Sequence, residues 1–161
     1  MQQKRSNKKL GRRTLQRSTA TKATSITSAA PATRGEKKIA ITTSKAALPI
    51  GPYSQAIRAG NLIFVAGEKG IDPKTGKLVP GGIVAETRQT LENIKAILGE
   101  AGASLDDAVS STVHMTNLKD FQEMNQVYAE YFRKDPPGRT TVQVSELPAG
   151  AQVEITVVAV V

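Results

Sequence analysis

The clearest pattern of hydrophobic and polar positions lies in residues 83–102, where largely apolar residues recur every three or four positions. They are Val84, Thr87, Leu91, Ile94 and Leu98. This spacing places side chains on one face of a helix, and Gly99 and Gly102 stand where such a helix would end. We therefore expect a helix here, with one face packed on a sheet.

A second helix is predicted to begin near Asp120. An N-cap aspartate followed three residues later by Glu123 is typical of a helix start. The apolar positions of this helix are Phe121, Met124, Tyr128 and Phe132. We interpret them as core residues. Asn125, in the first turns, can support a neighbouring loop.

Alternating or apolar runs predict the strands. They are 38–43, a hairpin of 54–58 and 62–67, then 108–116, 139–144 and 151–161. The segment 67–77 is predicted to be a turn-rich connection. The order strand, hairpin, helix, strand, helix, strand, strand indicates an α+β fold, with a mixed sheet and two helices on one face. The other face of the sheet would then need a partner.

One arginine stands at the start of a predicted strand. Pro136 and Pro137 fix the backbone in a rigid turn just before Arg139. From there the side chains alternate, so Arg139 and Thr141 point to the same face and can line one pocket. The sequence thus brings a fork-shaped cation and a hydroxyl together.

Glu154 is the one charged residue of the closing strand. That strand is apolar on nearly both faces, which predicts a central, covered position. A buried carboxylate is either paired with a neighbouring Arg or Lys or used in chemistry, and the residues alone leave both explanations open. His114, on the strand 108–116, has no partner motif and is interpreted as a polar-face residue.

Composition narrows the chemistry. A chain of 161 residues suits one domain, and no stretch approaches the roughly 20 apolar residues that cross a bilayer. We therefore expect a soluble protein that does not engage membranes. The chain has no cysteine and a single histidine, so thiolate sites and His-rich metal sites are excluded. We expect no metal and no cofactor.

The net charge of +8 is concentrated at the N-terminus. Residues 1–38 hold 11 Lys or Arg and one acidic residue, whereas residues 39–161 hold 11 basic and 13 acidic residues. A basic segment rich in Ser, Thr and Ala is typical of a transit peptide and is expected to be disordered. A nucleic-acid-binding arm is the alternative, which we weigh below targeting. We expect the mitochondrial matrix, with the plastid or the cytoplasm as alternatives, and no nucleic-acid binding by the folded domain 39–161.

Taken together, the motifs of residues 38–161 resemble the Rid family of reactive-intermediate deaminases, also called the YjgF or L-PSP family. The matching stretches are Ile50–Ala56, Val65–Gly67, Asp72–Gly76, Leu91–Leu98, Phe121–Phe132, Pro137–Val144 and Val153–Ile155. The resemblance implies a chorismate-mutase-like fold and a homotrimer with three clefts between subunits. Such a trimer would cover the open face of the sheet.

The resemblance also implies an activity and a set of site residues. The activity is hydrolysis of 2-imino acids, such as 2-iminobutanoate and 2-iminopropanoate, to 2-keto acids and ammonia. By position, Arg139 would bind the substrate carboxylate and Glu154 would activate the attacking water. Tyr53, Gly67 and Thr141 would line the cleft. Because Tyr53 follows a proline-rich loop, its role as a loop anchor stays open beside this one.

Some positions depart from the family pattern. Ala66 and Glu68 stand where Ser and Gln are usual, and Gly138 replaces Ala. If Glu68 points into the cleft it would repel an anionic substrate, whereas facing solvent it would change little. The alternative function is an RNA-directed or chaperone-like role without deaminase activity. A ribonuclease ordinarily needs a basic groove, stacking aromatics and an acid/base pair, which residues 39–161 offer poorly.

Overall fold

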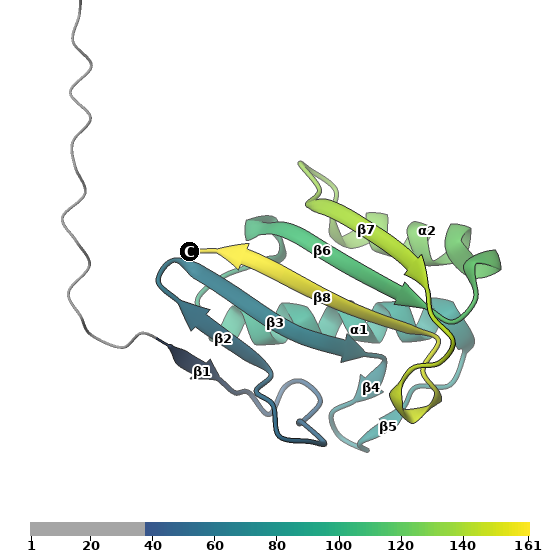
Figure 1. Ribbon diagram of the computed structural model, residues 1–161, viewed down its shortest axis with the longest axis horizontal. Coiled ribbons are helices and arrows are strands. Elements are labelled where there is room, and N and C mark those ends of the chain that lie inside the picture. The colour runs from purple at the N-terminus through teal and green to yellow at the C-terminus, as the bar shows by residue number, and fades with distance from the viewer. Residues whose placement is uncertain (1–37) are drawn as a thin grey trace, which may run out of the picture. The chain divides into compact units, whose positions relative to one another are not determined.

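A computed structural model describes residues 38–161, in which a six-stranded sheet carries two helices on one face (Figure 1). In space the strands follow the order β1 (Ile39–Ile41), β2 (Ala56–Ala59), β3 (Leu62–Lys69), β8 (Val153–Val160), β6 (Ala108–Met115) and β7 (Gly138–Gln143). The helices are α1 (Gly82–Glu100) and α2 (Phe121–Tyr131). The predicted α+β class with a mixed sheet is confirmed. The predicted targeting segment lies outside the described residues, apart from its last residue.

The sheet is mixed because one of its strand pairs is parallel. Neighbouring strands run antiparallel except β6 and β7, which α2 connects. A parallel pair needs a crossover of this kind, since a tight turn can join only antiparallel strands. β8 lies between β3 and β6, so the strand that carries Glu154 is central, as its apolar sequence predicts.

The core lies between the sheet and the helices. Alternate residues of β8 are buried against the helices, and the residues between them are partly exposed on the open face. The fully buried apolar residues of α1 are Leu91, Ile94, Ile97 and Leu98. Burying a side chain of this size contributes about 1.5–3 kcal/mol, so this layer holds α1 on the sheet. Neither helix among residues 38–161 is long and apolar enough to span a bilayer.

Two local expectations differ from the structure. Asp120 makes no side-chain cap hydrogen bond, because the chain enters α2 from a 3₁₀ turn (Leu118–Asp120) and Asp120 does not adopt the extended backbone of an N-cap. In the segment expected to be a turn-rich connection, β3 continues to Lys69 and is followed by a small ribbon. Its strands are β4 (Ile71–Asp72) and β5 (Lys77–Leu78). Two residues are too few to show strand periodicity.

A β-bulge in β3 determines which side chains face the open side of the sheet. The register between β3 and β8 shifts between Val65 and Glu68. An extra residue in one strand reverses the alternation of the side chains that follow. As a result, Glu68 pairs with Ile155 on the helix side and Lys69 pairs with Glu154 on the open side.

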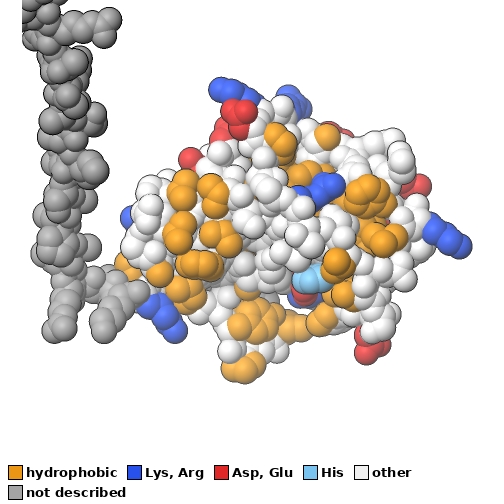
Figure 2. Space-filling view, turned by 45° about the horizontal axis from the view of Figure 1, so that its top comes forward, with side chains coloured by type: hydrophobic (Ala, Val, Ile, Leu, Met, Phe, Trp, Pro, Cys, Tyr) orange, Lys and Arg blue, Asp and Glu red, His pale blue; other side chains and the backbone are white. Residues whose placement is uncertain are grey.

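The open face of the sheet has no covering element among residues 38–161. Phe64 and Val142 are about 44% and 40% exposed there. Figure 2 shows hydrophobic side chains gathered in patches over the side in view, with few charges among them. Exposed apolar patches of this kind mark surfaces that contact a partner.

Candidate functional site

Glu154 lies in the middle of the open face, between two nitrogen-bearing side chains. Its neighbours across the sheet are Lys69 on β3 and His114 on β6. Lys69 Nζ donates to Glu154 Oε2 at 3.1 Å and to the Gly67 carbonyl oxygen at 3.1 Å. The Lys69 and Glu154 side chains are 8% and 19% exposed, so solvent screens this ion pair only in part. Lys69 is thus the pairing partner that the sequence left unidentified.

His114 faces the other oxygen of the same carboxylate. Its Nδ1 lies 3.7 Å from Glu154 Oε1, too far for a hydrogen bond. This nitrogen is buried and has no hydrogen-bond partner among residues 38–161, although 31% of the side chain is exposed. Both oxygens of Glu154 are therefore turned towards nitrogen atoms.

Gly67 leaves the space that the Glu154 carboxylate occupies. A Cβ atom at this position would lie 2.6 Å from Glu154 Cδ and 2.8 Å from Oε1. Contacts this short are essentially never made by real Cβ atoms, so a side chain would displace the carboxylate. Close approach explains the glycine at the bulge, where the backbone needs no left-handed conformation.

A cavity of about 300 Å³ opens beside Glu154. It is lined by Ile50, Tyr53, Ala66, Gly67, Lys69, Pro148, Glu154 and Thr156. The Tyr53 hydroxyl accepts a hydrogen bond from the Ile50 N–H at 3.2 Å, so Tyr53 anchors its loop and also forms a wall of the cavity. The structure therefore brings together three of the five predicted site residues, which are Tyr53, Gly67 and Glu154. We call Tyr53, Gly67, Lys69, His114 and Glu154 the carboxylate cluster.

Arg139 is held on the α2 side of the molecule. One guanidinium nitrogen donates to Asn125 Oδ1 at 2.7 Å. The guanidinium carbon lies 4.5 Å from the ring centroid of Tyr128 and 5.7 Å from that of Phe121. Stacking on aromatic rings orients a guanidinium without using all of its donors. Arg139 therefore keeps N–H groups available for a ligand.

Thr141 completes this second cluster, on the same face as Arg139 as the alternation predicts. Its hydroxyl is buried and has no hydrogen-bond partner in the part of the chain that the structure describes. An unpaired buried hydroxyl is unfavourable unless a ligand or water satisfies it. The residues that line the adjoining space of about 480 Å³ are Leu118, Phe121, Arg139 and Thr141. We call Arg139, Thr141, Asn125, Phe121 and Tyr128 the arginine cluster.

The two clusters lie on opposite faces of the sheet. Arg139 pairs with Ser111, whose hydroxyl is hydrogen-bonded at 2.7 Å to the Tyr128 hydroxyl of α2. Glu154 pairs with His114 on the open face. Within one chain, the structure does not bring Arg139 and Thr141 together with Tyr53, Gly67 and Glu154.

Glu68 lies neither in the cleft nor in solvent, which were the two alternatives for it. It is 6% exposed and points to the helix side, next to a cavity of about 10 Å³ under the loop 47–53. Burial raises its pKa to about 7; the charge of Lys69 opposes this shift and that of Glu154 adds to it. Glu68 is therefore a buried carboxyl group that stays protonated at pH values at which an ordinary glutamate is ionised.

Lys69 is the site residue that sequence reasoning missed. The sequence pattern predicts a turn from Gly67 onwards, which places Lys69 outside any strand. The available signal is the glycine itself, because a glycine within a strand pattern often marks a bulge. Extending the strand through a bulge at Gly67 would have placed Lys69 opposite Glu154.

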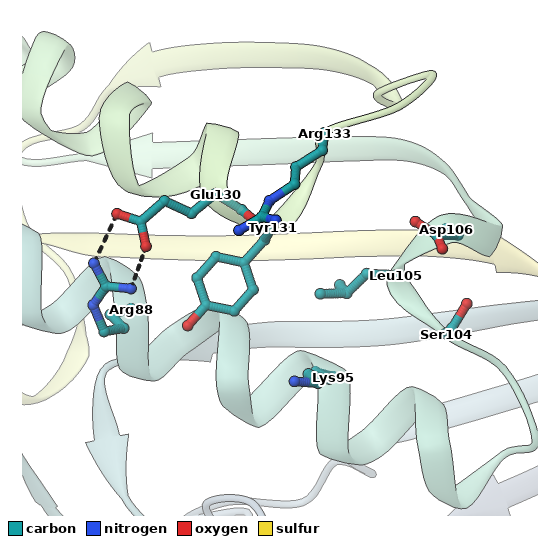
Figure 3. A pocket seen from close by; sticks show the side chains of 8 residues that line it. All are labelled: Arg88, Lys95, Ser104, Leu105, Asp106, Glu130, Tyr131 and Arg133. Atoms are coloured by element: carbon teal, nitrogen blue, oxygen red, sulfur yellow. Dashed lines mark hydrogen bonds and ion pairs between the residues drawn. The ribbon is translucent and has the colours of Figure 1, made fainter.

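A further cavity, of about 420 Å³, lies on the helix side and holds none of the predicted site residues (Figure 3). Arg88 of α1 donates two hydrogen bonds to the Glu130 carboxylate of α2, at 2.5 and 2.9 Å. Tyr131 donates to Glu92, and burial, aided by this hydrogen bond, raises its pKa to about 12. These contacts pair polar groups of the two helices with each other, so the cavity has the character of a helix–helix contact.

Comparisons with known proteins agree on one family. Residues 43–161 match the sequence profile of the family described as Endoribonuclease L-PSP. A RutC family protein of Pyrococcus abyssi is 54% identical over 122 residues, which cover 76% of this chain and 96% of that protein. The 2-iminobutanoate/2-iminopropanoate deaminase of Mus musculus is 43% identical over 120 residues, covering 74% of this chain and 89% of that protein. The crystal structure of RidA from an Antarctic Psychrobacter is 41% identical, with a TM-score of 0.75, and covers 76% of this chain and 99% of that one.

Proposed function

Because the chain belongs to the Endoribonuclease L-PSP family, which is the Rid family, we propose that it hydrolyses 2-imino acids to 2-keto acids and ammonia. The mammalian relative named above acts on 2-iminobutanoate and 2-iminopropanoate by its name, and these are the proposed substrates. The observation that carries the proposal is the presence of two complementary half-sites on the chain. One holds a guanidinium with free donors and the other holds a confined carboxylate.

Arg139 is suited to a planar carboxylate. A guanidinium and a carboxylate form two parallel hydrogen bonds, which fix the orientation of the bound group. The rings of Tyr128 and Phe121 hold the guanidinium plane before a ligand arrives. The unpaired Thr141 hydroxyl beside it offers one further hydrogen bond.

Glu154 is suited to move the protons of the reaction. Its carboxylate accepts a proton from water while the water oxygen bonds to C2 of the substrate iminium. It then returns that proton to the nitrogen, which leaves as ammonia when the C2–N bond breaks. Lys69 and Gly67 keep the carboxylate in place, because the former binds Oε2 and the latter leaves space for Cδ.

The proposed active unit is a homotrimer in which each cleft combines the carboxylate cluster of one copy with the arginine cluster of its neighbour. Two features support it. The clusters are on opposite faces of one chain, and the open face exposes apolar residues such as Phe64 and Val142. Head-to-tail contacts in a closed ring of three would bury these apolar residues and bring the unlike clusters of neighbouring copies together.

The direct test measures how fast 2-iminopropanoate disappears when an amino-acid oxidase generates it in place. We expect wild-type protein to accelerate the loss and Arg139→Ala and Glu154→Gln to do so far less, while both variants stay folded and trimeric. Ser110→Ala, an exposed open-face residue outside both clusters, serves as the matched control. Loss of imine at the uncatalysed rate with wild-type protein, across several imino acids, would reject the proposal.

The family description also names an endoribonuclease, which is the second candidate function. Residues 39–161 carry 11 basic and 13 acidic residues, so cationic groups for RNA are concentrated in residues 1–38. We expect any RNA binding to disappear when residues 1–38 are deleted, as measured by filter binding at fixed salt. Binding and cleavage of RNA by residues 39–161 alone would favour the nuclease function.

We propose a targeting role for residues 1–38, on their composition alone. Basic, Ser/Thr-rich and nearly acid-free segments direct proteins to organelles, here the mitochondrial matrix. The test fuses residues 1–38 to a fluorescent protein and follows it in eukaryotic cells. Diffuse fluorescence in the cytoplasm would reject the proposal.

A further inference from the structure

His114 presents a buried ring nitrogen to the carboxylate of Glu154 and has no hydrogen-bond partner there. The nitrogen is Nδ1, and the atom it faces is Oε1 at 3.7 Å. The other nitrogen, Nε2, has no partner among residues 38–161 and is not among the buried unpaired atoms, so solvent reaches it. The two nitrogens of one ring therefore lie in different surroundings.

This difference determines where the ring carries its proton. The carboxylate repels a lone pair on Nδ1. It attracts an N–H there, which also satisfies a buried atom that would otherwise stay unpaired. Closing the gap from 3.7 Å to hydrogen-bond length requires only a small movement of either side chain. Glu154 therefore favours the tautomer with Nδ1 protonated, which leaves Nε2 unprotonated on the open face.

We propose that His114 is a second acid/base residue of this site, held by Glu154 through Nδ1–H and exchanging protons through Nε2. The inference rests on the proposed imine hydrolysis. Across β6 and β8, the Glu154–His114 pair repeats a general arrangement in which a carboxylate fixes the tautomer of an imidazole that acts as a base.

The reaction needs a second proton acceptor, because water gives up both of its protons. The first goes to Glu154 when the water oxygen bonds to C2, and Glu154 passes it to the nitrogen. The second leaves the new hydroxyl when the C2–N bond breaks and the carbonyl forms. Nε2 of His114 accepts this proton and releases it to solvent or to the departing ammonia.

Glu154 can serve both the histidine and the water. An ionised carboxylate has about four lone-pair positions on its two oxygens. Lys69 occupies one position on Oε2, and Nδ1–H of His114 would occupy one on Oε1. The remaining positions can accept a water molecule that the cavity beside Tyr53 admits.

Among residues 38–161, few other charged groups lie near His114. Glu154 faces it from β8, Lys69 lies beyond Glu154 on β3, and Glu68 lies on the opposite side of the sheet. Its neighbour on β7 is Val142, which has no charge. The Glu154–Lys69 pair is therefore the nearest charged pair to the His114 ring.

The first test reads the tautomer directly and does not require activity. His114 is the single histidine of the chain, so the imidazole ¹⁵N signals of untagged full-length protein belong to one residue. We expect the Nδ1–H tautomer in wild-type protein above neutral pH, and a shift towards Nε2–H in Glu154→Gln. A wild-type ring with its proton on Nε2 would overturn the proposal.

The second test separates proton transfer from structure. In His114→Asn the amide nitrogen can take the place of Nδ1 beside Glu154, but the ring nitrogen that exchanges protons is lost. We expect kcat for imine loss to fall about 10²-fold with little change in KM, and the pH profile of kcat to differ from that of wild-type protein. Ser110→Ala should keep the wild-type rate and pH profile.

The outcomes distinguish the inference from the proposed function. Wild-type kcat and an unchanged pH profile in His114→Asn, with activity lost in Glu154→Gln, would overturn the role of His114 and keep the deaminase function. If wild-type protein hydrolyses no imino acid, the proposed function fails. In that case the role in proton transfer fails with it, and the NMR measurement still decides the tautomer.

Discussion

Arg139 and Glu154 project from opposite faces of the same sheet. Arg139 packs on Tyr128 and Asn125 of α2, whereas Glu154 lies on the open face between Lys69 and His114. A backbone layer separates the two side chains, so no rotamer change can bring them to one small substrate. A site that uses both must take them from two chains.

This arrangement predicts complementation between inactive variants. Arg139→Ala keeps the carboxylate cluster and Glu154→Gln keeps the arginine cluster, so a cleft between one copy of each is intact. In a closed ring of three, every mixed trimer regains one cleft, and random mixing of equal amounts restores about a quarter of the wild-type turnover. The measurement is imine loss after the two variants are unfolded and refolded together.

The control replaces one partner by the double variant Arg139→Ala/Glu154→Gln. Mixing it with Arg139→Ala gives no intact cleft, because neither chain supplies the guanidinium. Restored turnover in this control, or none in the first mixture, would contradict a cleft shared between copies.

Much of the fold follows from periodicity. The three- and four-residue spacing in 83–102 identifies α1, and the doubly apolar strand around Glu154 identifies a central position. The capping pattern at Asp120 misleads, since a 3₁₀ turn before it already directs the chain into α2. The strands of the β4–β5 ribbon hold two residues each, which is a single period, so no repeat appears in the pattern.

The candidate site is less predictable, because it depends on register and on which face the helices cover. Alternation places Arg139 with Thr141, but it gives no indication that both lie on the helix side. Val142, the apolar neighbour, is exposed on the open face, so the usual rule that apolar residues face the helices fails on this edge strand. The bulge after Val65 similarly hides Lys69 from a simple strand pattern.

Gly67→Ala should abolish most activity without unfolding the protein. The added methyl group would lie 2.6 Å from Glu154 Cδ, so the carboxylate must leave its position beside Lys69. We expect kcat to fall at least about 10²-fold, which is the usual contribution of general acid–base catalysis. The circular dichroism spectrum of the variant should match that of wild-type protein. The matched control is Gly99→Ala in α1, where nothing lies within 4 Å of the added atom. It should keep full activity and be neutral or more stable by up to about 1 kcal/mol.

Arg139→Lys should impair substrate binding although it conserves the charge. A lysine ammonium offers a point charge in place of a planar fork, and it stacks less well on Tyr128. We expect KM for the imino acid to rise about tenfold or more, because the variant loses one charge-assisted hydrogen bond to the substrate. The change in kcat should be smaller. Arg133→Lys, on the helix side, is the matched control and should change neither constant. Equal KM values for wild type and Arg139→Lys would argue against a carboxylate clamp.

Glu68 predicts a dependence of stability on pH. Burial raises its pKa from 4.5 to about 7, so between these pH values the folded protein holds a proton that the unfolded chain has released. The favourable contribution is present below about pH 4.5 and is lost as the pH rises towards 7. The rise in pKa from 4.5 to about 7 corresponds to about 3 kcal/mol of unfolding free energy, since one pKa unit is equivalent to about 1.4 kcal/mol.

Glu68→Gln removes this dependence, because the amide has nearly the same shape and stays neutral. Urea unfolding at fixed protein concentration should give equal stabilities for variant and wild type near pH 4.5, and a variant more stable by up to about 3 kcal/mol near pH 8. The difference in unfolding free energy between variant and wild type cancels the contributions of other groups. One of these is Glu86, because burial raises its pKa as well. Glu146→Gln, at an exposed position, should follow the wild-type curve throughout. If Glu68→Gln also followed the wild-type curve, the prediction would be wrong. The Glu68 carboxyl would then be ionised in the folded protein, because the charge of Lys69 would cancel the effect of burial on its pKa.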